Sequence, residues 1–251
     1  MTQFALLQAR TPNDVARTEE HAAFADRLGV AVSDINTIDI FTQTLDEQIF
    51  EQHDVLLVGG SGEYSVLDKV PSIRAFIDFL GLAADKGFPT FASCFGYQAM
   101  VLALGGEVIS DQQRAEVGSY TLRCTSTARE DPLFADMPEE FIAQLGHKDR
   151  ATVLPSCVEN LAESERCPNQ ALRVRGKPVY ATQFHPELTW RDNRKRFERY
   201  MSIYGKLFGD KEALSRLESH TPGPEANMLL PRFVERIVGA GGTGGAGGEG
   251  T

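Results

Sequence analysis

Cysteine is scarce in this sequence, and the positions of the few cysteines argue against two kinds of protein. Only four occur in 251 residues, at positions 94, 124, 157 and 167, and no two form a CxxC pair. Disulfide-stapled secreted domains and zinc sites both depend on closely spaced cysteines. We therefore expect no disulfide scaffold, no bound metal and a location in the reducing cytoplasm.

Long apolar runs are missing as well. No segment approaches the ~20 consecutive apolar residues that a helix needs to cross a bilayer. The first ten residues, MTQFALLQAR, lack the basic segment and long apolar core of a signal peptide. We expect no membrane attachment, and we expect these residues to begin the fold with a buried strand.

Positive charge is in deficit. The sequence has 25 Lys and Arg against 35 Asp and Glu, which gives a formal net charge of -10. The local basic run RDNRKR, at residues 191–196, also contains an acid and is typical of a solvated helix face. Because nucleic-acid binding needs a broad basic face to neutralise phosphates, we expect no nucleic-acid partner.

Short apolar segments alternate with helical patterns along the first two hundred residues. The predicted strands are residues 4–8, 35–41, 55–58, 89–93 and 179–184, and the predicted helices are residues 13–28, 71–84, 95–104 and 190–208. Alternating strands and helices favour parallel pairing through right-handed crossovers. The sequence therefore predicts an α/β fold with an open, mostly parallel sheet and helices on both faces. Residues 107–125 are predicted to form a small antiparallel flap beside it.

The composition changes after residue 208. We expect a helical extension over residues 209–238, in which the breaker TPGPE at 221–225 separates two helices. Its apolar residues fit either packing back on the sheet, which we prefer, or a homo-oligomer interface. Residues 239–251, GAGGTGGAGGEGT, are predicted to be disordered because they have too little apolar surface to offset ordering. The expected domain spans residues 1–208.

One cysteine lies in a setting that favours chemistry. In the segment PTFASCFGYQ, residues 89–98, a predicted strand ends at Cys94 and a helix begins directly after it. Ala92 and Gly96 are small, as a tight strand–turn–helix elbow requires. The elbow places the sulfur at a helix N-terminus, where partial positive charge favours a thiolate, and aims the N–H of Phe95 at the attacked group. An inert core thiol is the alternative, and it is preferred for the other three cysteines.

The last predicted strand ends in a candidate base. His185 follows it, Pro186 stiffens the turn, and Glu187 can reach the imidazole if the chain bends at the proline. A carboxylate there would fix the ring and stabilise its protonated form, as a thiol nucleophile requires. The alternative is a strand-end turn without chemistry.

A glycine loop follows the strand at residues 55–58. The residues Gly59, Gly60, Ser61 and Gly62 can present backbone N–H groups to an oxyanion. The loop lacks the Lys-Ser/Thr ending of a P-loop and the GxGxxG spacing of a dinucleotide turn, and a plain glycine turn is the alternative. All three segments end at the carboxyl edge of the predicted sheet, where open α/β sheets build their sites.

The order and spacing of these three segments resemble the class I (triad) glutamine amidotransferase family. The resemblance covers about residues 45–208, and GHKD at 146–149 followed by Leu154-Pro155 looks most like the glutaminase domain of GMP synthase and its stand-alone relatives. Two positions depart from the family pattern: Ala92 stands where glycine is usual, and Ser61 where proline is usual.

The resemblance implies a flavodoxin-like fold and hydrolysis of the glutamine side-chain amide. Cys94 would form a γ-glutamyl thioester, and the N–H groups of Phe95 and Gly60 would hold the oxyanion. His185 would protonate the departing ammonia and then activate water, while Glu187 orients His185. No cofactor is implied.

The same resemblance implies three substrate contacts. Gln98 and Gly59 are expected to help position the substrate. His147 either shapes the glutamine pocket or is an ordinary polar loop residue.

The triad alone leaves three functions open, because the first two use the same thioester and the resemblance includes no fused synthase or synthetase domain. The first is a stand-alone amidotransferase that hydrolyses L-glutamine and supplies ammonia to a synthase or synthetase partner. The second is a γ-glutamyl peptide hydrolase or transferase that uses the same thioester. The third, a non-enzymatic regulatory or binding subunit, is disfavoured by the presence of all three triad residues.

Overall fold

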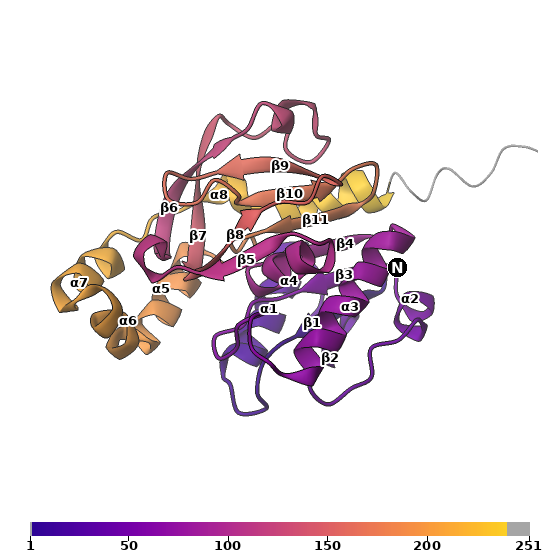
Figure 1. The fold of residues 1–251 in the computed structure, drawn as a ribbon, viewed down its shortest axis with the longest axis horizontal. Coiled ribbons are helices and arrows are strands. Elements are labelled where there is room, and N and C mark those ends of the chain that lie inside the picture. Colours follow the sequence, from indigo (N-terminus) through magenta and orange to yellow (C-terminus); the bar gives the residue numbers. More distant parts are fainter. Residues whose placement is uncertain (1, 240–251) are drawn as a thin grey trace, which may run out of the picture.

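The computed structural model describes residues 2–239, and its centre is a nine-stranded sheet (Figure 1). The strand order is β2-β1-β3-β4-β11-β10-β9-β6-β7. The first five in this order run parallel: β2 (Ile35–Asp39), β1 (Phe4–Gln8), β3 (Val55–Val58), β4 (Thr90–Ser93) and β11 (Val179–Thr182). These strands lie where the sequence predicts strands, so the predicted parallel sheet is confirmed in this half.

The second half of the sheet is antiparallel. It consists of β10 (Ala171–Val174), β9 (Val158–Glu163), β6 (Glu116–Cys124) and β7 (Glu140–His147). Part of the predicted flap belongs here, because β6 pairs with β7 along almost its whole length. Only β5 (Glu107–Ser110) forms a separate two-stranded sheet, with β8 (Asp149–Val153).

Both faces of the sheet are covered by helices, as the sequence predicts. Neighbouring residues of one strand, Leu6 and Leu7, are both buried but belong to different hydrophobic clusters. The cluster of Leu7 includes residues of α3 (Pro71–Lys86) and α4 (Phe95–Ala103), and the cluster of Leu6 includes Phe24 of α1 (Ala16–Leu28). A strand buried on both sides reads as a continuous apolar run, and this explains the composition of β1 and β3.

The remaining short elements connect these layers. They are α2 (Gln48–Gln52) and the 3-10 turns η1 (Val32–Asp34), η2 (Gln112–Arg114) and η3 (Thr127–Glu130). Within residues 2–239, no helix has both the length and the apolar character to cross a membrane.

The predicted helix over residues 190–208 is divided at Tyr200 into α5 (Trp190–Arg199) and α6 (Met201–Phe208). Thr189 caps α5, since its side chain accepts a hydrogen bond from the N–H of Asp192. With α7 (Asp210–Glu218), these helices form one end of the molecule beside β6 and β7 (Figure 1). The predicted single helix is therefore two helices.

The last helices pack back on the sheet. They are α8 (Pro224–Asn227), α9 (Leu229–Arg232) and the π-helix η4 (Phe233–Val238). Phe233 is fully buried and meets the rings of Phe91 and Tyr180 edge-on, at centroid distances of 5.4 and 5.8 Å. The last helices of the extension therefore pack on the sheet, which is the preferred one of the two alternatives. The segment predicted to be disordered lies, from residue 240 on, outside the described residues.

Candidate active site

Cys94 occupies a strained turn between a strand and a helix. β4 ends at Ser93 and α4 begins at Phe95. Within residues 2–239, Cys94 is the only residue other than glycine with a positive φ, at 51°. Such a backbone costs about 1–3 kcal/mol and is found mainly at functional sites. The observed geometry is the elbow that the sequence predicts.

The close approach of backbones at the elbow explains its small residues. A Cβ added to Gly96 would lie 2.6 Å from Val58 Cγ1 and 3.1 Å from the Cβ of Ala92. Only glycine fits at position 96 without moving β3 or β4. The methyl group of Ala92, where the family usually has glycine, is accommodated because position 96 has no side chain.

His185 and Glu187 lie together directly after β11. The Nδ1 of His185 is 2.6 Å from Oε1 of Glu187, and both side chains are buried. Burial alone would lower the pKa of His185, but the charges of Glu187 and Cys94 and hydrogen bonds with both raise it to about 10. Burial opposes the charge of Glu187 too, yet the protonated ring of His185 keeps the pKa of that carboxyl below its usual value. His185 therefore holds a proton at neutral pH.

The glycine loop closes over the same site. A Cβ at Gly60 would lie 2.8 Å from Cε1 of His185 and 3.7 Å from the Cβ of Cys94. The structure thus brings Gly60 close to both His185 and Cys94, as the sequence predicts. Its N–H, however, donates to Oε1 of Glu20 at 3.0 Å. The N–H of Phe95 is at the start of α4, where helical N–H groups lack intrahelical partners.

Ser61 organises the rest of this loop. Its hydroxyl donates to the carbonyl of Ala9 at 2.9 Å and accepts from the N–H of Tyr64 at 3.1 Å. Proline would stiffen the backbone at this position, whereas Ser61 restricts it by two hydrogen bonds. The departure from the family pattern therefore keeps the loop tied to β1.

Glu20 was not found by sequence reasoning, although it supports the glycine loop from behind. Its carboxylate is fully buried and accepts from Nη2 of Arg10 at 2.8 Å and from Nε2 of Gln8 at 3.1 Å. Burial alone would lower the pKa of Arg10, but Glu20 and Asp14 raise it above its usual value. A Cβ at Gly59 would lie 2.4 Å from Cδ of Glu20, so the carboxylate packs directly on the loop.

We predict that Glu20→Gln destabilises the protein by about 1.5–3 kcal/mol, the usual contribution of hydrogen bonds to a buried charge. The substitution leaves the buried Arg10 with only one of its two carboxylate partners, Asp14. Urea denaturation would measure the loss. The matched control is Glu19→Gln on the same helix, whose partners Arg199 and Lys195 lie near the surface and whose loss costs about 1 kcal/mol or less. Equal losses in both variants would contradict a buried Glu20–Arg10 pair.

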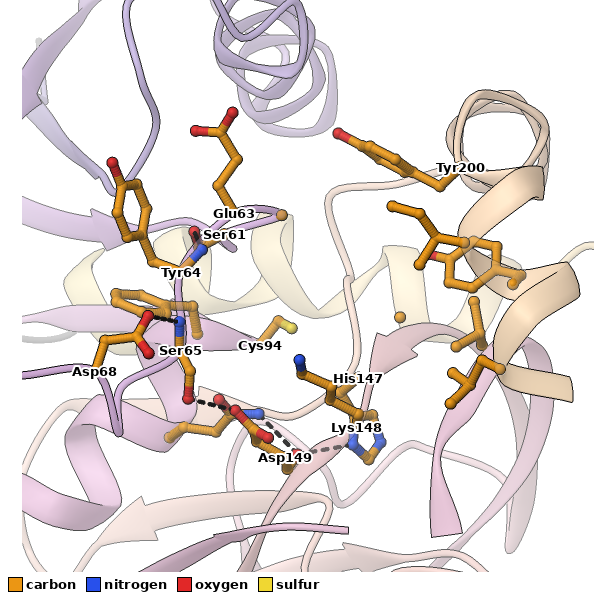
Figure 2. Close-up of a pocket in the computed structure, with 18 residues that line it drawn as sticks. Ser61, Glu63, Tyr64, Ser65, Asp68, Cys94, His147, Lys148, Asp149 and Tyr200 are labelled. Carbon is orange, nitrogen blue, oxygen red and sulfur yellow. Dashed lines mark hydrogen bonds between the residues drawn. The ribbon is translucent and has the colours of Figure 1, made fainter. Parts of the chain in front are cut away.

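A cavity of about 280 Å³ opens above Cys94 (Figure 2). One side is formed by the loop after Gly60, with Ser65 and Asp68, and by the turn that carries Lys148 and Asp149. The opposite side is formed by α6. A cavity that contains a buried cysteine and a few polar groups has the character of a small-molecule binding site.

Gln98 and His147, both predicted to contact the substrate, line this cavity but are also engaged by the protein. Nε2 of Gln98 donates to the carbonyl of Asp149 at 2.8 Å. The ring of His147 lies 3.0 Å from the same carbonyl and 3.1 Å from Oε2 of Glu116. Both residues therefore fix the turn at Lys148 and Asp149.

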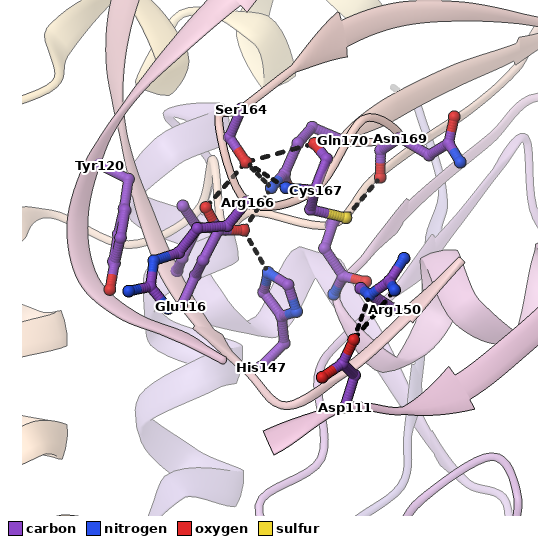
Figure 3. A network of polar contacts seen from close by, with 12 residues as sticks. Asp111, Glu116, Tyr120, His147, Arg150, Ser164, Arg166, Cys167, Asn169 and Gln170 are labelled. Atoms are coloured by element: carbon purple, nitrogen blue, oxygen red, sulfur yellow. Dashed lines mark hydrogen bonds and ion pairs between the residues drawn. The ribbon is translucent and has the colours of Figure 1, made fainter. Parts of the chain in front are cut away.

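Glu116 is the centre of the network that holds His147 (Figure 3). Its fully buried carboxylate also accepts from Nε2 of Gln170 at 2.6 Å and from the hydroxyl of Ser164 at 2.7 Å. These contacts join β6, β7 and the loop before β10. The antiparallel half of the sheet thereby positions one wall of the cavity.

Asp149 is a second site residue without a predicted role. Its Oδ2 accepts from the hydroxyl of Ser65 at 2.5 Å, while Oδ1 is buried and has no partner within the protein. A buried carboxylate oxygen without a partner is costly, so it needs a hydrogen-bond donor from outside the chain, such as water or a ligand group. Its position in the GHKD segment was the available sequence signal. No cluster of His, Cys, Asp or Glu side chains suited to a metal ion occurs in the part of the chain that the structure describes.

Solved structures share this fold. A glutamine amidotransferase from Thermotoga maritima superposes with a TM-score of 0.69 at 20% identity, covering 94% of this chain and 98% of that one. The glutamine amidotransferase from Methylobacillus flagellatus gives a TM-score of 0.67 at 16% identity, with 94% and 96% covered. The likeness confirms the flavodoxin-like fold that the family resemblance implied.

Sequence comparison agrees with the fold. A glutamine-hydrolyzing GMP synthase subunit of Methanocaldococcus jannaschii is 36% identical over 123 residues, which are 49% of this chain and 63% of that protein. The GMP synthase (glutamine-hydrolyzing) of Thermosipho africanus is 29% identical over 76% of this chain and 32% of its own length. The chain thus spans less than two thirds of these relatives. The model of the family "Glutamine amidotransferase class-I" matches residues 22–201. The chain belongs to the class I glutamine amidotransferase family.

Proposed function

We propose that the protein hydrolyses the side-chain amide of L-glutamine through a γ-glutamyl thioester on Cys94 and releases ammonia for transfer to an acceptor. The observation that carries this proposal is the site geometry. A strained cysteine at a helix N-terminus and His185, which is paired with the buried Glu187, line one narrow space that adjoins the main cavity.

The proposed reaction has two halves. The thiolate of Cys94 attacks the amide carbonyl, and the N–H of Phe95 stabilises the oxyanion. The C–N bond breaks as His185 gives its proton to the nitrogen, and ammonia leaves. His185 then removes a proton from water, which attacks the thioester and releases glutamate and the thiolate. The N–H of Gly60 now donates to Glu20. To act as a second oxyanion donor, it must give up this hydrogen bond and donate to the substrate oxygen instead.

The polar side of the cavity complements an amino acid. Oδ1 of Asp149, which has no protein partner, fits the α-ammonium group, and the neighbouring Lys148 supplies a positive charge for the α-carboxylate. In this arrangement Gln98 and His147 do not touch the substrate but position Asp149, which binds it. Gly59 likewise acts indirectly, because its contact with Glu20 positions the glycine loop.

A separate acceptor protein completes the proposal. The chain spans only part of its relatives, and several of these are named as one subunit of a glutamine-hydrolyzing GMP synthase. We propose that ammonia passes to a synthase or synthetase partner. The four free cysteines fit the cytoplasmic location that we also propose.

The proposal is tested by covalent trapping. A diazo-ketone analogue of glutamine is expected to add once to the protein, at Cys94, because the thiolate attacks the electrophile in place of the amide. Peptide mass spectrometry would locate the adduct, with Cys124→Ser as a control at a buried cysteine outside the cavity. If no adduct forms on wild type, even with added cell extract, the enzymatic proposal fails.

A further inference from the structure

The wall of the cavity that faces the polar side is largely apolar. It consists of Tyr200, Ile203, Tyr204 and Leu207, which we call the α6 wall. Spacings of three and four residues place them on one face of this helical segment. Figure 2 shows Tyr200 across the cavity from Ser65 and Asp149, with Cys94 between them. The nucleophile therefore lies at the junction of a polar half and an apolar half.

The position of the base shows which part of a substrate meets the α6 wall. His185 must reach the leaving nitrogen to protonate it. A narrower space of about 60 Å³ joins Cys94 and His185, and Tyr200 and Tyr204 line both this space and the main cavity. With the amino-acid part held at Asp149, a group attached to the leaving nitrogen would extend along α6.

Ammonia, the leaving group from glutamine, has no apolar part that could pack against the α6 wall. Ile203 lines the cavity and is 57% exposed, although an apolar side chain is stabilised by leaving water. Tyr200 and Tyr204 line the cavity and offer aromatic rings that can pack against an apolar group. Burial and the nearby charges of Tyr200 and Cys94 raise the pKa of Tyr204 to about 12, so its hydroxyl stays protonated.

We propose that the α6 wall is a subsite for an apolar substituent on the leaving amine, and that the enzyme hydrolyses γ-glutamyl amides of hydrophobic amines and amino acids. The inference rests on the thioester chemistry of the proposed function. The bond between the γ-carbonyl carbon and the amine nitrogen breaks, His185 supplies the proton, and the free amine leaves. Water then hydrolyses the thioester to glutamate.

Purified enzyme should be compared on glutamine, γ-glutamylglycine and γ-glutamylphenylalanine. We expect kcat/KM for γ-glutamylphenylalanine to exceed that for γ-glutamylglycine about tenfold or more, as an added apolar group typically gives in a matching pocket. The ratio of these two values should fall about tenfold in Ile203→Asp and in Leu207→Ala. The control is Leu214→Asp on α7, where the side chain is 51% exposed and outside the cavity.

The outcomes separate this inference from the proposed function. Labelling of Cys94 and hydrolysis of glutamine, without a preference for γ-glutamylphenylalanine, would overturn the subsite and leave the function standing. A preference that survives in both α6 variants would overturn it as well. If Ile203→Asp instead abolishes only the activation of glutamine hydrolysis by cell extract, the α6 wall is a partner surface and the inference is wrong. Absence of any labelling would remove the proposed function itself.

Discussion

Cys94→Ser is expected to lower kcat for glutamine hydrolysis by about ten-thousandfold or more, the usual result of losing the nucleophile of a catalytic triad. A serine hydroxyl stays un-ionised at neutral pH, and the protonated His185 cannot act as its base. The elbow itself should be unaffected, because serine has nearly the shape of cysteine. Steady-state release of glutamate and ammonia would measure the loss, and equal circular dichroism spectra would show that the fold is retained.

Cys94→Gly and Cys94→Ala separate the chemistry from the strain at the same position. Both should be inactive. Glycine adopts a φ of 51° without strain, whereas alanine keeps a strain of about 1–3 kcal/mol. Glycine in turn loses ~0.5–1 kcal/mol through its greater conformational entropy in the unfolded chain, and this loss is smaller than the strain that it relieves. Cys94→Gly should therefore melt at a higher temperature than Cys94→Ala. Equal melting temperatures would contradict a strained elbow, and hydrolysis by Cys94→Ser close to wild type would contradict the thioester.

The site could be predicted from the sequence because each part follows a buried strand. Gly60, Cys94 and His185 come after β3, β4 and β11, which are neighbours in the parallel half of the sheet. Continuous apolar runs mark such strands, and parallel strands end at one edge, so residues far apart in sequence meet there. The pairing of His185 with Glu187 needed only a local bend at Pro186.

The residues that were missed act over long distances or through burial. Glu20 lies on a helix forty residues before the loop that it holds, and a glutamate within a helical pattern is usually exposed. Its spacing of four from the buried Ala16 and Phe24 was the available signal. The antiparallel strands were not identified as part of the sheet, because their alternation is short and their partners are distant. The position of α6 depends on a break at Tyr200 that the helical pattern does not mark.

Glu187→Gln is expected to lower kcat by about ten-thousandfold, since a triad carboxylate fixes the imidazole and stabilises its protonated form. Glutamine keeps the volume of the side chain and removes its charge. Without that charge, only Cys94 still opposes the effect of burial, so the pKa of His185 falls from about 10. The alkaline limb of kcat/KM should then move to lower pH by more than one unit, as a pH series on wild type and variant would show.

The same pair makes stability depend on pH. The pKa of His185 is about 10 in the folded protein and 6.5 for an ordinary histidine, so the folded state keeps a proton that the unfolded chain loses in between. Its contribution to stability is therefore complete below pH 6.5 and declines as pH rises toward 10. The melting temperature of Glu187→Gln should fall less over this range than that of wild type, while the exposed control Glu218→Gln should follow wild type. Parallel curves for wild type and Glu187→Gln, together with an unshifted alkaline limb, would show that Glu187 does not hold the proton on His185.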